Sequence, residues 1–307
     1  MIKNPLLKYS VEALLHEANP KGEPYFRRTY FYKSLFLLQD NLKKKDIDIQ
    51  LPYCWYLHGP LIEPESFKEK TGTNLEEYIA NNSTVPIINV YEENVTDTEK
   101  NIILKEIRLI LKKYKTGPIW NENYGDPLVG ESYHRAPYQY QVTFKREYLP
   151  SFNNLEREPD LYRYAFNNIS QNFIKILDRL IIQFPEKEMS EILDEYLFWD
   201  EITRLKIDNA EPFYDIKKCS NIYWEFFCKL LRIIQNENIL SSVVEKWENE
   251  FKIKQPIFNE VLDNLQKDSF VIMNQKKDFA IDPAIDTIVQ RLMSYARNTA
   301  TQYKKEM

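Results

Sequence analysis

The chain is poor in histidine, cysteine and glycine, three residue types that enzymes use for metal, nucleophilic and phosphate chemistry. It contains three histidines, three cysteines and six glycines among 307 residues. It has no GxxxxGK[ST] or GxGxxG phosphate loop, no HExxH zinc motif, no CxxC pair and no GxSxG nucleophile elbow. We therefore do not expect an ATPase, a Rossmann oxidoreductase, a zinc hydrolase or a serine hydrolase. No catalytic residue, cofactor or metal ligand is predicted.

Long apolar runs and an excess of positive charge are also missing. No uncharged apolar segment approaches the roughly 18 residues of a membrane span, and the N-terminus lacks the apolar segment of a secretion signal. The formal net charge is -5, so no global field attracts nucleic acid, and any such contact has to be local. Cys54, Cys219 and Cys228 are an odd number without CxxC spacing, and each has an apolar or aromatic neighbour, which predicts buried free thiols in a reducing cytoplasm.

The C-terminal third carries the pattern of a winged helix. Apolar residues recur at three-or-four spacing over 223–234 and 240–247, and a third apolar face begins at Gln255-Pro256 and runs to Leu265. Residues 269–273 and 279–281 are β-prone and flank a polar turn. This order predicts three helices and a two-stranded wing, with the third helix as the recognition helix.

The side chains of this predicted module leave its partner open. Four lysines near the third helix and in the wing turn are the candidate phosphate contacts: Lys252, Lys254, Lys276 and Lys277. The third helix itself offers Glu260 and Asp263, which would face phosphate with little compensating charge. These two carboxylates are instead candidate contacts to a protein partner or to a second copy of the chain.

The N-terminal half begins with two predicted helices and a sharp turn. The helices run from Asn4-Pro5 to residue 18 and from about Phe26 to Asn41. An aromatic cluster, Trp55-Tyr56, is followed after two residues by Gly59-Pro60, which indicates a turn. A side chain at Gly59 is expected to strain that turn.

Together with the helix at 32–39, this WYxxGP element resembles the start of the Panacea family and related prokaryotic winged-helix proteins. The resemblance covers roughly residues 26–70, less than a fifth of the chain. Such proteins are antitoxins, regulators and accessory components of bacterial conflict systems. The resemblance therefore implies a regulatory or defence setting.

A capping box, Thr96 to Glu99, predicts the start of another helix, which ends near Lys115. From there to Pro137 the chain is polar and rich in glycine, which indicates a long loop. Three residues of this loop form the candidate small site: Glu131, His134 and Arg135. An ordinary surface role for His134 is the alternative.

The middle of the chain predicts a helical hairpin. An apolar stripe runs from Leu161 to Phe184 between two prolines, and a shorter one follows over 189–197. A stripe this long fits a core position or a partner groove.

We expect a mainly α, multi-domain protein with a C-terminal winged helix and an N-terminal winged-helix-like module. The predicted domains are 1–115, 116–220 and 221–307. The expected function is that of a non-catalytic accessory or regulatory subunit of a defence-type complex, binding a protein partner such as an SMC-type ATPase, or a second copy, with DNA contact left open. The alternatives are a DNA-binding regulator or antitoxin, and a divergent metal-dependent nuclease built from scattered residues such as Asp126, Glu131 and Lys145.

Overall fold

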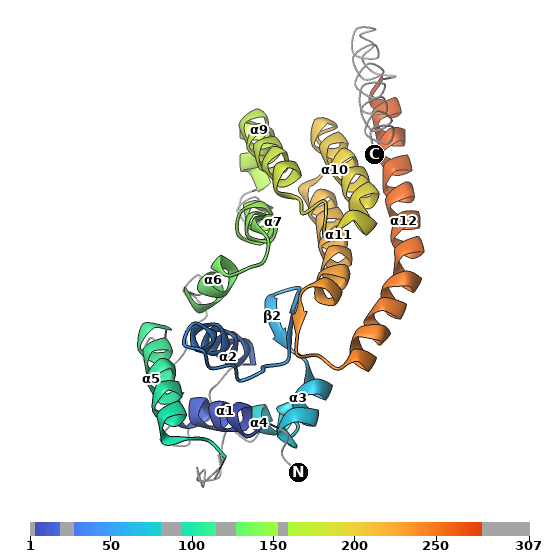
Figure 1. Cartoon of the computed structure of the whole chain (residues 1–307). Coiled ribbons are helices and arrows are strands. Elements are labelled where there is room, and N and C mark those ends of the chain that lie inside the picture. The colour runs from blue at the N-terminus through green and yellow to red at the C-terminus, as the bar shows by residue number, and fades with distance from the viewer. Residues whose placement is uncertain (1–3, 19–27, 81–93, 115–126, 153–158, 278–307) are drawn as a thin grey trace.

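The computed structural model describes residues 4–18, 28–80, 94–114, 127–152 and 159–277 (Figure 1). These residues are mainly helical and include one three-stranded sheet. The prediction of a mainly α fold is confirmed. Buried apolar side chains from Leu7 to Leu262 form one contiguous core.

The described residues of the N-terminal part include five helices: α1 (Pro5–Ala18), α2 (Arg28–Lys43), α3 (Pro64–Thr71), α4 (Leu75–Ala80) and α5 (Asp97–Tyr114). The Asn4 side chain caps α1 by accepting a hydrogen bond from the Leu7 N–H at 2.9 Å. The predicted capping box opens α5, because Glu99 N–H donates to the Thr96 hydroxyl at 3.2 Å and Thr96 N–H donates back to the Glu99 carboxylate at 2.9 Å. The predictions of α1, α2 and α5 are confirmed.

The WYxxGP element forms a hairpin of β1 (Tyr53–Tyr56) and β2 (Gly59–Ile62). The strands are antiparallel, and Tyr56 pairs with Gly59 across the turn. Gly59 has φ +90°, a backbone conformation that favours glycine. The expected turn and its need for glycine are confirmed.

A third strand, β3 (Asn236–Glu237), pairs with the other edge of β1, so the sheet order is β2-β1-β3. Trp55 N–H donates to the Gln235 carbonyl at 2.9 Å, and the Tyr53 hydroxyl donates to Glu237 at 2.9 Å. The sheet therefore joins the N-terminal helices to the segment that leads into the last helix.

The middle of the chain contains these elements in order: α6 (Pro127–His134), α7 (Gln139–Thr143), the π-helix η1 (Phe144–Tyr148), α9 (Pro159–Gln183), the 3-10 helix η2 (Ser190–Ile192), α10 (Leu193–Asp208) and α11 (Phe213–Ile234). α9 and α10 form the predicted helical hairpin, which Arg204 and Asp178 link at 2.8 Å.

The predicted loop before Pro137 is wrong for 127–134, which form α6, and its earlier part lies outside the described residues. Pro127 suits a first helical turn, and burial of Leu128 and Tyr133 outweighs the low helix propensity of Gly130.

The centre of the molecule is an aromatic core. Trp199 of α10 stacks on Tyr223 of α11 with ring centroids 4.4 Å apart. Phe144 of η1 stacks on Trp224 at 4.7 Å. Each buried ring removes a large apolar area from water, so this core holds α7, η1, α10 and α11 together.

The last helix among the described residues, α12 (Ser241–Lys277), is continuous over 37 residues (Figure 1). The separate third helix and the wing strand predicted at 269–273 are therefore wrong, and the second predicted strand at 279–281 lies outside the described residues. Tertiary contact outweighs the β propensity of this segment: Ser269 is buried, and its carbonyl accepts a hydrogen bond from the Asn209 amide at 3.3 Å.

The three-domain division stays a prediction. Its boundary after residue 220 falls within α11, which contacts β1 as well as α10 and α12.

Candidate interaction site

The inward face of α12 is fixed by aromatic packing. Phe258 stacks on Phe226 of α11 with ring centroids 4.0 Å apart and an interplanar angle of 11°, and Phe251 stacks on the same ring at 5.3 Å. Leu262 is fully buried one turn further along. These contacts decide which side of α12 faces α10 and α11.

Ion pairs reinforce this orientation at one position. The Glu250 carboxylate accepts hydrogen bonds from Lys229 at 2.9 Å and Arg232 at 2.5 Å, both on α11. The Lys229 hydrogen bond lowers the pKa of Glu250; burial opposes that shift, and the Arg232 contact adds to it. The Arg232 guanidinium also lies 5.0 Å from the Trp247 ring.

The opposite side of α12 is exposed and apolar at its middle. We call the residues Lys252, Ile253, Ile257, Glu260 and Asp263 the outward face of α12. Ile253 is 65% exposed and Ile257 is 49% exposed, although both are large aliphatic side chains.

Figure 1 shows α12 as an arc whose convex side faces away from α10 and α11. Pro256 lies inside the helix and is exposed. Proline removes the hydrogen bond to the Lys252 carbonyl, and water can solvate that carbonyl because both residues are exposed. Helix bending at proline accounts for a convex outward face.

The predicted nucleic-acid and partner residues all map to α12. Lys252, Lys254, Glu260 and Asp263 are exposed, and none forms an ion pair with another described residue. Lys276 and Lys277 belong to the last turn of this helix and not to a wing turn; their side chains lie outside the described part of the chain.

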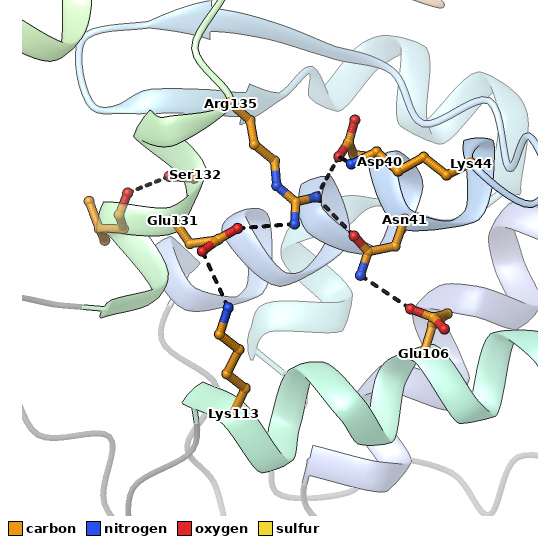
Figure 2. Close-up of polar contacts among 9 residues, drawn as sticks. Asp40, Asn41, Lys44, Glu106, Lys113, Glu131, Ser132 and Arg135 are labelled. Atoms are coloured by element: carbon orange, nitrogen blue, oxygen red, sulfur yellow. Dashed lines mark hydrogen bonds and ion pairs between the residues drawn. The ribbon is translucent and has the colours of Figure 1, made fainter.

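Arg135 from the second candidate site is the centre of a polar network (Figure 2). Its guanidinium donates to Asp40 at 2.5 Å, to Asn41 at 3.0 Å and to Glu131 at 3.2 Å. Lys113 of α5 approaches the same Glu131 carboxylate at 3.4 Å. The network therefore connects α2, α5 and α6.

This arrangement links α2, α5 and α6 through charge-assisted hydrogen bonds. Burial opposes ionisation of Glu131, but the Arg135 hydrogen bond and the charge of Lys113 outweigh it, so the pKa of Glu131 is lowered. His134 is exposed, and its imidazole makes no side-chain hydrogen bond with another described residue. The structure brings together Glu131 and Arg135 but not His134.

Two lysine side chains, Lys33 and Lys145, lie near the turn of the β1–β2 hairpin. The Lys33 side chain is 2% exposed, and its ammonium donates to the carbonyls of His58 and Pro60, the latter at 3.0 Å. Lys145 lies 5.7 Å from the Trp224 ring, whose indole N–H donates to the Leu57 carbonyl at 3.1 Å. Burial, followed by the charges of Lys145 and Lys33, lowers the pKa of His58.

Thiol and metal chemistry find little support in the described residues. Cys54, Cys219 and Cys228 are buried and free, as predicted. Burial raises the pKa of Cys54 and Cys219 to about 12, so these thiols are protonated at neutral pH. The described part of the chain has no group of three His, Cys, Asp or Glu side chains placed to hold a metal ion.

None of the described helices has the length and apolar character needed to cross a membrane. No family model, curated protein or solved structure matches the chain.

Sequence reasoning missed Lys33 and Glu250. A lysine in the apolar run Tyr32 to Leu38 was the available signal for the first, since a cation there needs buried acceptors. Glu250 has no such signal, because its partners Lys229 and Arg232 lie on the preceding helix.

Proposed function

We propose that this chain is a non-catalytic accessory or regulatory subunit that binds another protein chain through the outward face of α12. The observation that carries the proposal is the pair of exposed isoleucines, Ile253 and Ile257, on a helix whose opposite side is fully packed. Exposed aliphatic residues one helical turn apart, rimmed by charges, suit helix-in-groove or helix-to-helix recognition.

The setting of a bacterial defence or conflict complex follows from the resemblance of the WYxxGP element. A winged-helix-like arrangement is proposed only for residues 1–115, where two helices precede the hairpin. An SMC-type ATPase is one partner class that such accessory subunits serve. This assignment is by analogy of domain order.

The acidic residues of the outward face argue against DNA binding as the function. Glu260 and Asp263 are exposed beside the isoleucines and would approach phosphate without a neutralising partner among the described residues. At most four lysines could release counterions, which limits the salt dependence to a log-log slope of about -3.6. We expect no tight, sequence-specific DNA binding by the purified protein at physiological salt.

The test is copurification of the tagged full-length chain from its host, with each retained protein identified by mass spectrometry and then bound again in purified form. Ile253→Glu with Ile257→Glu should abolish that binding, because each change places a charge in an apolar contact. The matched control is Leu109→Glu on α5, where the native side chain is 51% exposed.

Two results would contradict the proposal. One is a reconstituted complex that tolerates both isoleucine substitutions. The other is nanomolar, sequence-dependent DNA affinity at physiological salt, which would make the chain a DNA-binding regulator.

A further inference from the structure

Cationic side chains from two segments meet near the turn of the β1–β2 hairpin. Lys145 and Arg146 are consecutive residues of η1, and His58 belongs to the turn. The Lys145 ammonium lies 5.7 Å from the Trp224 ring. The indole N–H of Trp224 donates to the carbonyl of Leu57, the residue before His58. The charge of Lys145 also contributes, after burial, to the lowered pKa of His58, so η1 brings positive charge to the turn.

Arg146 differs from the other arginines whose side chains the structure describes. Those six each pair with a carboxylate: Arg28, Arg108, Arg135, Arg179, Arg204 and Arg232. Arg146 is exposed and makes neither an ion pair nor a hydrogen bond with another described residue. The adjacent carboxylate, Glu147, pairs with Arg179 instead. The Arg146 guanidinium therefore presents its donors to an external anion.

Lys145 is a half-buried cation whose hydrogen bonds are not made within the described part of the chain. Burial lowers the pKa of Lys145, and the neighbouring Cys228 opposes that shift. Cys228 supplies no negative charge at neutral pH, because burial raises the pKa of its thiol well above the usual value. An ammonium has three N–H donors, and burying them without acceptors is unfavourable. A bound anion would supply both the acceptors and the opposite charge.

Gly130 of α6 leaves the space that the Arg146 guanidinium occupies. A Cβ atom at position 130 would lie 3.3 Å from Nη2 of Arg146 and 3.7 Å from its Nη1. Glycine inside a helix is less stable than alanine, but here the missing side chain lets the guanidinium lie against α6. This contact restricts the guanidinium before any ligand binds, which reduces the entropy that binding costs.

Tyr133 adds a neutral donor beside the same turn. It is 3% exposed, and its hydroxyl has no hydrogen-bond partner among the described residues. Its Cε2 atom lies 3.6 Å from the position of a Cβ atom at Gly59. Burial and then Cys228 raise the pKa of Tyr133, whereas the charge of Arg146 opposes them. The hydroxyl therefore stays protonated and lies within the field of Arg146.

We propose that Lys145, Arg146, His58 and Tyr133 bind a dianionic phosphate group, either free or at the end of a small molecule. Lys145 and Arg146 carry two positive charges, and guanidinium and ammonium groups both recognise phosphate. A phosphate monoester is largely a dianion at neutral pH, because its second pKa is about 6. A carboxylate or a phosphodiester carries only one charge. This site lies apart from the outward face of α12, so it goes beyond the proposed function and is tested independently of it.

The test is isothermal titration calorimetry of the full-length protein with inorganic phosphate and with glycerol 3-phosphate, in a chloride buffer of fixed ionic strength. We expect a dissociation constant on the order of 0.1–1 mM. Tighter binding of glycerol 3-phosphate would identify a phosphorylated small molecule, and tighter binding of inorganic phosphate the free ion.

Variants at η1 locate the binding site. Lys145→Gln with Arg146→Gln should weaken binding by at least about 10-fold. Arg146→Gln alone, at an exposed position, should weaken it by at least about 3-fold and serves if the double variant does not fold. Lys105→Gln with Lys112→Gln, on exposed positions of α5, removes the same charge and should leave the affinity unchanged.

NMR titration of the imidazoles gives a readout that a purely structural role would not change. The chain has three histidines, and His58→Asn assigns the resonance of His58. A bound dianion favours the protonated imidazole, so saturating glycerol 3-phosphate should raise the pKa of His58. The exposed His16 of α1 is the internal control and should titrate as before.

Four results would overturn the proposal. They are the absence of both heat and a change at His58 with 10 mM ligand, η1 variants that bind like wild type, an α5 variant that loses as much affinity as the η1 double variant, and acetate that binds as tightly as phosphate. Hexathymidylate that binds more tightly than glycerol 3-phosphate through Lys145 and Arg146 would replace the small molecule with nucleic acid.

Discussion

The helices α5 and α12 lie on opposite edges of the molecule in Figure 1 and use their charged side chains differently. On α5, Arg108 makes two hydrogen bonds to Glu17 of α1, both at 2.9 Å, and Glu106 is buried against Lys45 and Asn41 of the α2 segment. These charged side chains of α5 therefore form ion pairs and hydrogen bonds with α1 and with the α2 segment.

On α12, two charged side chains in the first three turns are used in this way: Glu250 pairs with Lys229 and Arg232 of α11, and Lys246 lies 3.7 Å from Glu65 of α3. The charges of its outward face have no ion-pair partner among the described residues, and they surround two exposed isoleucines. The charged side chains of a helix can therefore either form ion pairs with neighbouring helices of the same chain or remain exposed to solvent. The positions of the oppositely charged residues decide which of the two occurs.

The largest expected effect tests the inward face of α12. Phe258→Ala should destabilise the fold by about 3–5 kcal/mol, because it removes a buried ring that stacks on Phe226. Ile257→Ala, at the neighbouring and half-exposed position, should cost less than about 0.5 kcal/mol. Urea unfolding of both variants measures the difference. Equal losses would mean that the two faces of α12 are not distinct.

The next effect concerns the β1–β2 hairpin, whose sheet joins the N-terminal helices to the segment that leads into α12. Gly59→Ala should cost about 1–3 kcal/mol, because φ is +90° and a Cβ atom would lie 2.9 Å from the Lys33 ammonium. Gly72→Ala is the control, since φ is +74° but nothing lies within 4 Å of its Cβ. Thermal unfolding should rank Gly59→Ala as the more harmful. The reverse order would argue against close packing of Lys33 under the turn.

A smaller effect compares a cation inside an ion-pair network with an exposed cation. Arg135→Ala should cost about 1–2 kcal/mol, because it loses three hydrogen bonds while Asp40 and Glu131 keep lysine partners. Lys252→Ala and His134→Ala should each change the free energy of unfolding by less than about 0.5 kcal/mol. If His134→Ala lowers the free energy of unfolding by more than this amount, His134 belongs to the candidate site after all.

The smallest effect is a pH dependence at the turn. The folded pKa of His58 lies below its ordinary value of 6.5, so the unfolded chain binds the proton more readily. The stability that neutral His58 contributes is complete above about pH 6.5 and is lost as the pH falls toward the folded pKa. The loss between pH 7 and 5 should be below about 1 kcal/mol, since the imidazole is partly exposed. His58→Asn should flatten this part of the profile measured by urea unfolding.

Local signals in the sequence predicted the N-terminal elements well. The Asn4 cap, the Thr96 capping box and the Gly59 turn each depend on residues within a few positions of one another. Such features form wherever the segment lies in the fold, so the sequence alone identifies them.

The same reasoning failed for α12, because packing decided its structure. Pro256 and the β-prone run from Ser269 pointed to helix breaks, but the contacts of Phe251, Phe258 and Leu262 with the core keep the segment helical. Those contacts involve side chains on α11 that no local pattern connects with α12.

The polar network of Arg135 was also beyond local prediction. Glu131 and Arg135 are four residues apart and meet because 127–134 are helical, whereas the sequence indicated a loop there. The partners Asp40 and Asn41 lie more than 90 residues away, and only the fold brings them to Arg135.

The late pairing of β3 has a consequence for synthesis on the ribosome. The β1–β2 hairpin is complete at Ile62, but the second edge of β1 must wait for Asn236. At about 5–20 residues per second, this leaves a Tyr-Cys-Trp-Tyr edge open for roughly 10–35 s. An unpaired strand edge is a template for strand addition by other chains, so the nascent protein is exposed to aggregation during this interval.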